Sequence, residues 1–186
     1  MEYRCLATSV EGFVQQLAVA YITHGYWFYV TGTIPEGKDP AAVDTKLIDR
    51  YGIAISKWAR CRRKKQGLAN MQYLRHDRFF VLLATKGRHE FFERERASIH
   101  DVRRKSIRFA GYSIGCRKGR DGRWHVCVRL AAHVTGDVEV YLREQTSRRC
   151  ANKVLRELSA FAPIRWQLLK ALQTAENERR RGIARL

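Results

Sequence analysis

The chain has 186 residues, of which 45% are hydrophobic and 11% aromatic, so it can bury a core and is not disordered throughout. Its 36 lysines and arginines against 18 acidic residues give a formal net charge of +18. So large an excess favours a polyanionic partner, most often nucleic acid. A membrane partner is disfavoured, because the positive residues lie on several separate segments and no apolar run reaches the roughly 18 residues of a spanning helix.

Five cysteines, an odd number, include no Cys-x-x-Cys pair. This argues against a zinc ribbon and against a disulfide framework, and together with the absence of a secretory-type start it predicts a cytoplasmic protein. Cys116 and Cys127 flank a predicted hairpin and could face each other, although thiols inside cells mostly stay reduced.

In chain order, the first predicted helix starts at Thr8 or Ser9 and ends at Gly25. Residues 26–34 are aromatic and β-branched, which predicts a strand. Trp27 and Tyr29 share one face of it, where they either stack unpaired bases or pack beneath helices.

Asp39-Pro40 predicts the start of a helix that runs to about Tyr51. A second helix is expected from near Ser56 to Gly67, with Trp58 as its inward anchor. Five of six consecutive residues in its later turns are basic. The helix dipole explains one or two of them, so we expect phosphate contact and not only a solvated helix end. These residues are Arg60, Arg62, Arg63, Lys64 and Lys65.

Residues 69–76 alternate as in a strand, and His76-Asp77 predicts a tight turn. Residues 78–85 form an apolar run that predicts a central strand covered on both faces. The next segment, 88–106, is expected to be a strand or an irregular helix, and it carries three more candidate phosphate ligands: Arg103, Arg104 and Lys105.

A hairpin is predicted from two arms, Ile107–Cys116 and Trp124–Leu130, around an Asp121-Gly122 turn. Its basic tip either grips a nucleic-acid backbone or is simply solvated. From about Asp137 the composition is helical. The predicted fold is α+β, a ferredoxin- or RRM-like antiparallel sheet with packed helices and a C-terminal helical pair. Residues 1–135 would be the core and 136–186 a basic extension. Candidate ligands here are Arg117, Lys118, Arg120, Arg123, Arg148, Arg149 and Lys153.

The strand 26–34, the basic helical crossover and the strand Arg78-Phe79-Phe80-Val81-Leu82-Leu83 resemble the core of rolling-circle replication initiators and single-strand transposases. That resemblance implies a ferredoxin-like sheet. It also implies a His-hydrophobic-His metal motif, but Arg78-Phe79-Phe80 stands at that place, so no metal or other cofactor is expected. The chain is also similar to uncharacterised bacterial proteins with the same two strands, which implies no activity.

Three functional hypotheses follow. The first is a non-catalytic protein that binds structured RNA or single-stranded nucleic acid in preference to a duplex operator, as part of a ribonucleoprotein or mobile element. The second is a mobile-element nicking or transposing enzyme with Tyr141 as nucleophile, His76 and His89, and a carboxylate such as Asp77 or Glu90. The third is a small interaction or anti-defence protein that binds a protein or membrane surface.

Overall fold

The computed structural model describes residues 3–131 together with Gly136 and Val140. The C-terminal helical pair, Tyr141 and the candidate ligands Arg148, Arg149 and Lys153 therefore lie outside the described residues. The chain divides into two compact units, one of Met1–Ile107 and Ile114–Cys127 and the other of Arg108–Ser113 and Val128–Leu186. The sheet and helices described next belong to the first unit.

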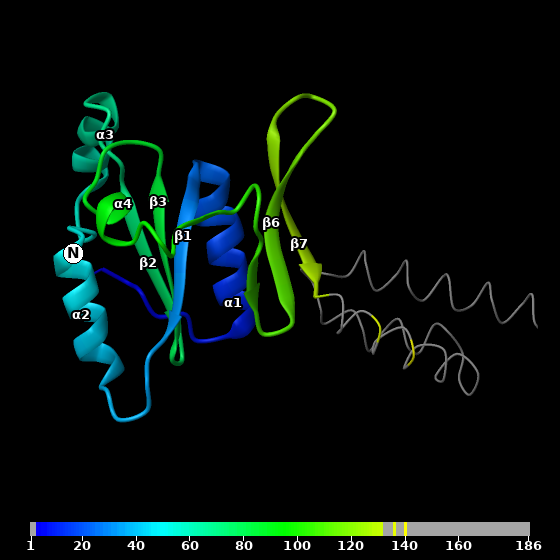
Figure 1. The fold of residues 1–186 in the computed structure, drawn as a ribbon, viewed down its shortest axis with the longest axis horizontal. Helices are drawn as coiled ribbons and strands as arrows, with labels where there is room; N and C mark the ends of the chain where they lie inside the picture. Colours follow the sequence, from blue (N-terminus) through cyan, green and yellow to red (C-terminus); the bar gives the residue numbers. More distant parts are fainter. Residues whose placement is uncertain (1–2, 132–135, 137–139, 141–186) are drawn as a thin grey trace, which may run out of the picture. The chain divides into compact units, whose positions relative to one another are not determined.

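A four-stranded antiparallel sheet forms the centre of this unit, and Figure 1 shows its strands between helices. The strands are β1 (Tyr26–Thr33), β2 (Met71–His76), β3 (Phe79–Thr85) and β4 (His100–Asp101), in the order β2-β3-β1-β4. Each neighbouring pair is antiparallel. The predicted α+β class with an antiparallel sheet is confirmed, and the segment 88–106 holds both a short helix and a short strand.

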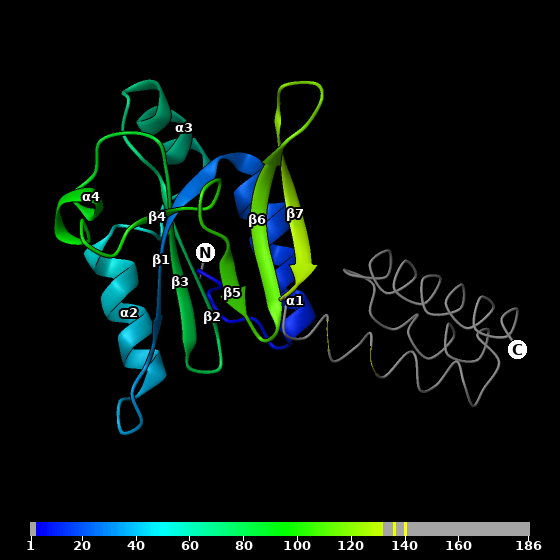
Figure 2. The same cartoon turned by 45° about the vertical axis from the view of Figure 1, so that its right-hand side comes forward.

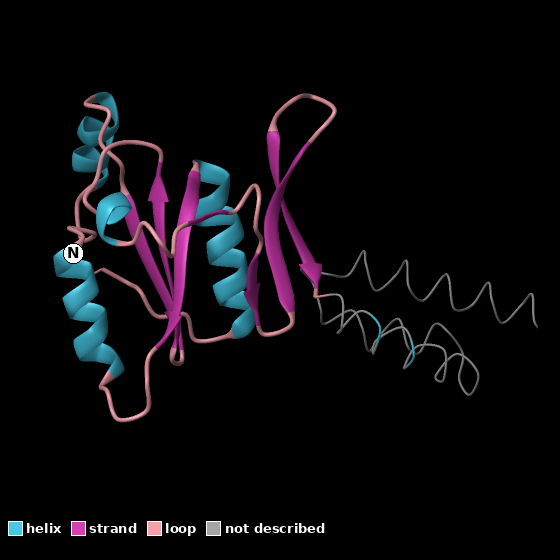
Figure 3. Ribbon diagram, viewed as in Figure 1, coloured by secondary structure: helices cyan, strands magenta, loops and turns pink. Residues whose placement is uncertain are grey.

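The helices are cyan in Figure 3, and the first three begin directly after capping residues that the sequence predicts. Helix α1 (Val10–Gln15) is capped by Ser9 and continues through a π-helical and a 3₁₀ turn to Gly25, which adopts a left-handed φ of 91°. Helix α2 (Pro40–Arg50) is capped by Asp39, and α3 (Lys57–Lys65) by Ser56. The short α4 spans Phe91–Arg94. None of the helices among the described residues has both the length and the apolar composition needed to cross a bilayer.

Both faces of the sheet are covered, with α1 on one side and α2, α3 and α4 on the other (Figure 1). On the second side, side chains of β1, β2 and β3 such as Tyr73 and Leu82 pack with Tyr51 and Phe91. On the first side, the ring of Phe13 meets Phe79 edge-on, with 5.9 Å between the ring centroids. Residues 81–84 of β3 are buried, which confirms the predicted central strand covered on both faces.

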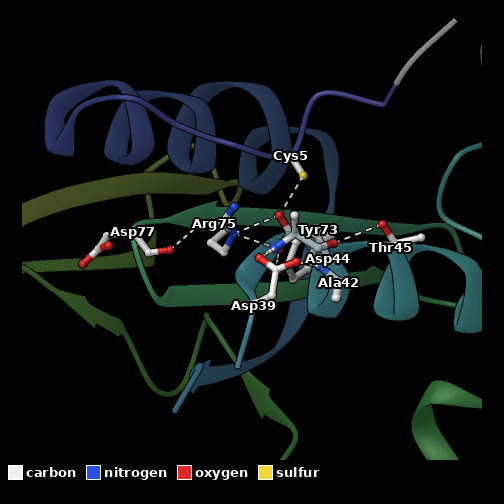
Figure 4. Close-up of polar contacts among 9 residues, drawn as sticks. Cys5, Asp39, Ala42, Asp44, Thr45, Tyr73, Arg75 and Asp77 are labelled. Atoms are coloured by element: carbon white, nitrogen blue, oxygen red, sulfur yellow. Dashed lines mark hydrogen bonds and ion pairs between the residues drawn. The ribbon is translucent and has the colours of Figure 1, made fainter. Parts of the chain in front are cut away.

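A buried ion pair fixes α2 to β2 (Figure 4). The Nε of Arg75 donates to both carboxylate oxygens of Asp44, at 2.8 and 2.9 Å, and the hydroxyl of Tyr73 donates to Asp44 Oδ1 at 2.6 Å. The Cys5 thiol donates to Asp44 Oδ2 at 3.6 Å, and the Arg75 guanidinium also donates to the backbone carbonyl of Asp77. A charged pair at this depth holds its helix in one position, because either partner alone would be a buried, uncompensated charge.

The predicted hairpin is a three-stranded sheet of β5 (Ile107–Phe109), β6 (Tyr112–Lys118) and β7 (Trp124–Leu130), in that order. The prediction of one continuous first arm was wrong. Ala110 and Gly111 have φ values of 44° and 80°, and a two-residue loop with both φ positive turns the chain between β5 and β6. At the second turn Gly122 has a φ of 73°, as the Asp-Gly signal predicts. No disulfide joins Cys116 and Cys127.

Candidate nucleic-acid interface

Helix α3 has an inner and an outer face, and its basic residues divide between them. Arg60 and Arg63 are half-buried. The Nη2 of Arg60 donates to the carbonyl of Ile53 at 3.4 Å, and the amide of Asn70 donates to the carbonyl of Arg60 at 3.1 Å. Arg60 is therefore partly engaged in holding the helix to the body. Arg62, Lys64 and Lys65 are exposed.

The expected inward anchor of α3 is wrong, because the Trp58 side chain is 77% exposed. No residue of α3 is fully buried. The contacts that hold the helix include hydrogen bonds of its backbone and of the Arg60 side chain. The prediction assumed that the single large apolar residue of a helix must point inward, which fails where a helix is attached by hydrogen bonds.

A backbone clamp brings two further basic residues to the end of α3. The N–H of Ala69 donates to the carbonyl of Arg88 at 3.1 Å, and the N–H of Arg88 donates to the carbonyl of Gly67 at 3.0 Å. Lys86 and Arg88 are both exposed. Sequence reasoning missed these two residues. The signal for them was their position directly after β3, at the same end of the sheet as the start of β2.

The turn after β4 contains an arginine held in a fixed orientation. The guanidinium of Arg103 forms a bidentate ion pair with Asp101, with distances of 2.6 to 3.1 Å, and lies 4.2 Å above the ring of Trp27. It also lies 5.7 Å from the ring of Trp124, the first residue of β7 after the hairpin tip. Burial raises the pKa of Asp101, but the hydrogen bonds from Arg103 outweigh this effect and the net pKa is lowered. The charge of Arg103 is thus neutralised by a carboxylate, whereas Arg104 and Lys105 have no carboxylate partner among the ion pairs of the described residues.

Arg104 and Lys105, which follow Arg103, are exposed and line an open pocket of about 530 Å³. Lys105 Nζ lies 2.9 Å from Nε2 of His100. The remaining lining includes Phe28 and Ile99, so the pocket combines an apolar floor with cationic groups. Such a surface suits an anionic ligand with an apolar part, and nucleotides have this character.

The tip of the β6–β7 hairpin carries four exposed basic residues, Arg117, Lys118, Arg120 and Arg123. The contacts of Asp121 are with residues of the same hairpin. Its carboxylate lies 3.0 Å from His125 Nε2 and accepts from the backbone N–H of Arg123. The hydrogen bond to His125 lowers the pKa of Asp121. The only acid of the tip is therefore occupied locally, and no carboxylate pairs with the four basic side chains among the described residues.

The structure brings the candidate residues into two groups within the first unit. Arg62, Lys64 and Lys65 join Lys86 and Arg88 at the end of α3. Arg104 and Lys105 follow Val102, whose carbonyl accepts from the N–H of Cys116 on β6. In Figures 1 and 2, α3 and the hairpin tip reach beyond the same end of the β1–β3 sheet. They are separate projections and do not form one helix face.

The two strand aromatics proposed for base stacking do not present free rings. Tyr29 is 2% exposed, and its hydroxyl donates to the carbonyl oxygens of Lys105 and Ser106 at 3.1 and 3.3 Å. Trp27 is half-buried under the guanidinium of Arg103. For Tyr29 the alternative prediction, packing in the core, is the one that the structure confirms.

The histidines of the enzyme hypothesis are not brought together. His76 ends β2, opposite Phe79 at the start of β3, whereas His89 follows the far end of β3. The strand between these ends has seven residues, about 20 Å at the usual rise. Burial is the main cause of the lowered pKa of His89. Among residues 3–131, no three His, Cys, Asp or Glu side chains form a group that could hold a metal ion.

Comparison of the chain with protein-family models, with curated proteins and with solved structures gave no match. The resemblance to replication initiators and transposases therefore stays a prediction. What can be argued about function depends on the geometry of the side chains described above.

Proposed function

We propose that this protein binds nucleic acid without cleaving it, and that the outer face of α3 is the centre of the binding surface. The observation that carries the proposal is the state of Arg62, Lys64 and Lys65. All three are exposed, and none has a carboxylate partner among the described residues. Unpaired cations on a rigid helix are available to phosphates, whose neutralisation releases counterions and supplies most of the affinity.

The strand order also bears on how such a protein would bind. The order β2-β3-β1-β4 and the helices between β1 and β2 and between β3 and β4 support a ferredoxin-like core. RRM domains with such a sheet stack bases on aromatic side chains of one sheet face. Here α1 lies on one face and α2 and α4 on the other, so we assign binding to cations outside the sheet (Figure 1).

We favour RNA or single-stranded DNA over a duplex operator, since the sequence contains no helix-turn-helix pattern with a recognition helix. We also propose that the protein acts in the cytoplasm, where the thiols of Cys5, Cys61 and Cys116 would stay reduced. No specific observation favours the nicking or transposing alternative, because His76 and His89 lie at opposite ends of β3 and Tyr141 lies outside the described residues.

The test compares binding of labelled RNA, single-stranded DNA and duplex at 50 to 200 mM salt. Each phosphate contact to a single strand contributes about 0.7 to the slope of log affinity against log salt. Replacing three cations by glutamine should therefore lower the slope by about 2.1, so that the wild type loses about 18-fold more affinity than the variant over this fourfold salt range. The variant carries glutamine at Arg62, Lys64 and Lys65.

The control removes the same charge from α2 and the loop before it, where the side chains are also exposed. It carries glutamine at Lys38, Lys46 and Arg50. We expect this control to keep the wild-type slope, because a general loss of net charge acts weakly at these salt concentrations. Equal slopes in the two variants would remove α3 from the binding surface. Absence of binding to any polynucleotide at 50 mM salt would refute the proposed function itself.

A further inference from the structure

Trp58 is the most exposed large hydrophobic side chain of the residues that the structure describes, at 77%. It lies in the first turn of α3, two residues after the Ser56 cap, whose hydroxyl accepts from the N–H of Ala59 at 3.2 Å. A capped helix start has a defined backbone, so the indole projects from a fixed point. Exposed single apolar residues are common, but a tryptophan this open on a basic helix calls for a partner with a flat apolar face.

The neighbours of Trp58 on the helix surface are cationic. Residues three, four and seven positions further along lie on the same stripe of a helix, and here they are Cys61, Arg62 and Lys65, all exposed. At 1.5 Å rise per residue, Arg62 and Lys65 begin about 6 and 10.5 Å from Trp58 along the axis. The stripe therefore presents one aromatic plane followed by two flexible cations, with the inner-face residues Arg60 and Arg63 turned away from it.

We propose that Trp58 stacks on an unpaired base while Arg62 and Lys65 contact the flanking phosphates. Helix α3 would then select single-stranded or looped nucleic acid over a continuous duplex, because a paired and stacked base offers no free face to an aromatic ring. This inference rests on the proposed function of α3 and adds its substrate class. It also moves base stacking from the strand aromatics, which the fold covers, to a residue that the fold leaves open.

A protein partner matches the stripe less well than a polynucleotide does. Docking of an apolar protein surface needs a contiguous apolar patch, whereas Trp58 is followed on its stripe by a cysteine and two cations. An aromatic side chain set among cations is the combination that single-strand binding surfaces use, since bases supply π-faces and the backbone supplies negative charge.

The first test measures the affinity of the protein for a single strand of about 12 nucleotides and for a duplex of about 12 base pairs. Loss of one stacked base costs a single strand about 5- to 150-fold in affinity, from 1–3 kcal/mol per base. We expect Trp58→Ala to show a loss in this range for the single strand, an unchanged duplex affinity and an unchanged salt slope. Trp58→Phe should recover most of the loss. Trp124→Phe serves as the matched control for Trp58→Phe, because Trp124 is 42% exposed but lies at the start of β7 and not on α3.

The second test uses indole fluorescence excited at 295 nm, where phenylalanine does not emit. A single strand should quench wild-type emission, and Trp58→Phe should lose most of this quenching while it still binds. Equal losses for single strand and duplex in Trp58→Ala, or unchanged affinity for both, would overturn the inference and leave the proposed function standing. A changed elution volume of Trp58→Ala would also overturn it, because Trp58 would then pack against a second copy. If the wild type binds no polynucleotide, the proposed function has failed as well.

Discussion

Replacing Asp44 by alanine tests whether the buried ion pair holds α2 in place. The side chains of Arg75 and Asp44 are 11% and 9% exposed, so the pair is nearly removed from water. The substitution would take from Arg75 both hydrogen bonds of its Nε and from Tyr73 the acceptor of its hydroxyl. Of its contacts within the described residues, the Arg75 guanidinium would keep only the hydrogen bond to the Asp77 carbonyl, and its charge would stay buried without compensation.

Breaking a buried pair by removing one partner costs about 3–5 kcal/mol of unfolding free energy. For a chain of 186 residues, each kcal/mol corresponds to about 2–4 °C, so the melting temperature should fall by about 6–20 °C. Replacing both partners by apolar residues of similar size, Asp44→Leu with Arg75→Met, should recover most of this loss, because no buried charge is then left unpaired.

The measurement is urea unfolding at pH 7 with Asp49→Ala as control, since Asp49 lies on the same helix with an exposed side chain. The control should change the unfolding free energy by less than about 0.5 kcal/mol. Equal effects of Asp44→Ala and Asp49→Ala would refute the view that the pair anchors α2. Because α3 is untouched, Asp44→Ala should still bind polynucleotides well below its melting temperature.

Two further predictions concern the loop after β3. Nδ1 of His89 accepts from the N–H of Phe91, and burial lowers the pKa of His89. The unfolded chain therefore takes up this proton first, so the free energy of unfolding should fall as pH drops below about 6.5. His89→Asn keeps an acceptor but cannot titrate; its urea midpoint should fall less than that of the wild type between pH 7.5 and 5.5, and an equal fall would contradict the reasoning. In Gly87→Ala, the new Cβ would lie 2.5 Å from the backbone nitrogen of Ala69, whereas Gly37→Ala, also at a positive φ (89° against 146° for Gly87), meets open space. Thermal melting should show the larger loss for Gly87→Ala, by about 1–3 kcal/mol, and comparable losses would mean that strain in φ alone acts there.

The elements that sequence reasoning placed correctly are those with a local chemical signal. Asp39 and Ser56 cap the starts of α2 and α3, and each side chain accepts from backbone N–H groups of the first turn. Gly25 and Gly122 take the positive φ values that their turns require. Such signals depend on a few consecutive residues, so they can be read without knowing what packs on the segment.

The buried ion pair had no such signal. Asp44 and Arg75 are 31 positions apart, and each alone looks like an ordinary surface residue. Only the pairing of α2 with β2 brings them together. The break between β5 and β6 was missed for a different reason, because Ala110 takes a φ of 44° that alanine rarely adopts and that no propensity predicts.

For the candidate interface, the sequence identified the basic run of α3, but it did not show which of the basic side chains face the protein and which face solvent. Arg60 and Arg63 face the body, whereas Arg62, Lys64 and Lys65 face solvent, and the direction depends on how α3 is attached. That attachment is polar: Ile53 and Asn70 supply groups that hydrogen bond to Arg60. The sequence instead predicts an apolar side chain, Trp58, that anchors the helix by pointing inward. With the attachment known, Trp58 becomes a residue of the outer face.

The way in which the carboxylates are used strengthens the argument for a polyanionic partner. Asp44 pairs with Arg75, Asp101 with Arg103 and Glu90 with Arg94, and in the described residues no ion pair reaches the outer face of α3. These three carboxylates are therefore engaged in contacts away from that face. Positive charge that the fold leaves uncompensated on one helix adds self-repulsion to the folded state, and a bound phosphate backbone would remove it. Stability should accordingly rise when a polynucleotide is added, and by less when Arg62, Lys64 and Lys65 have been neutralised.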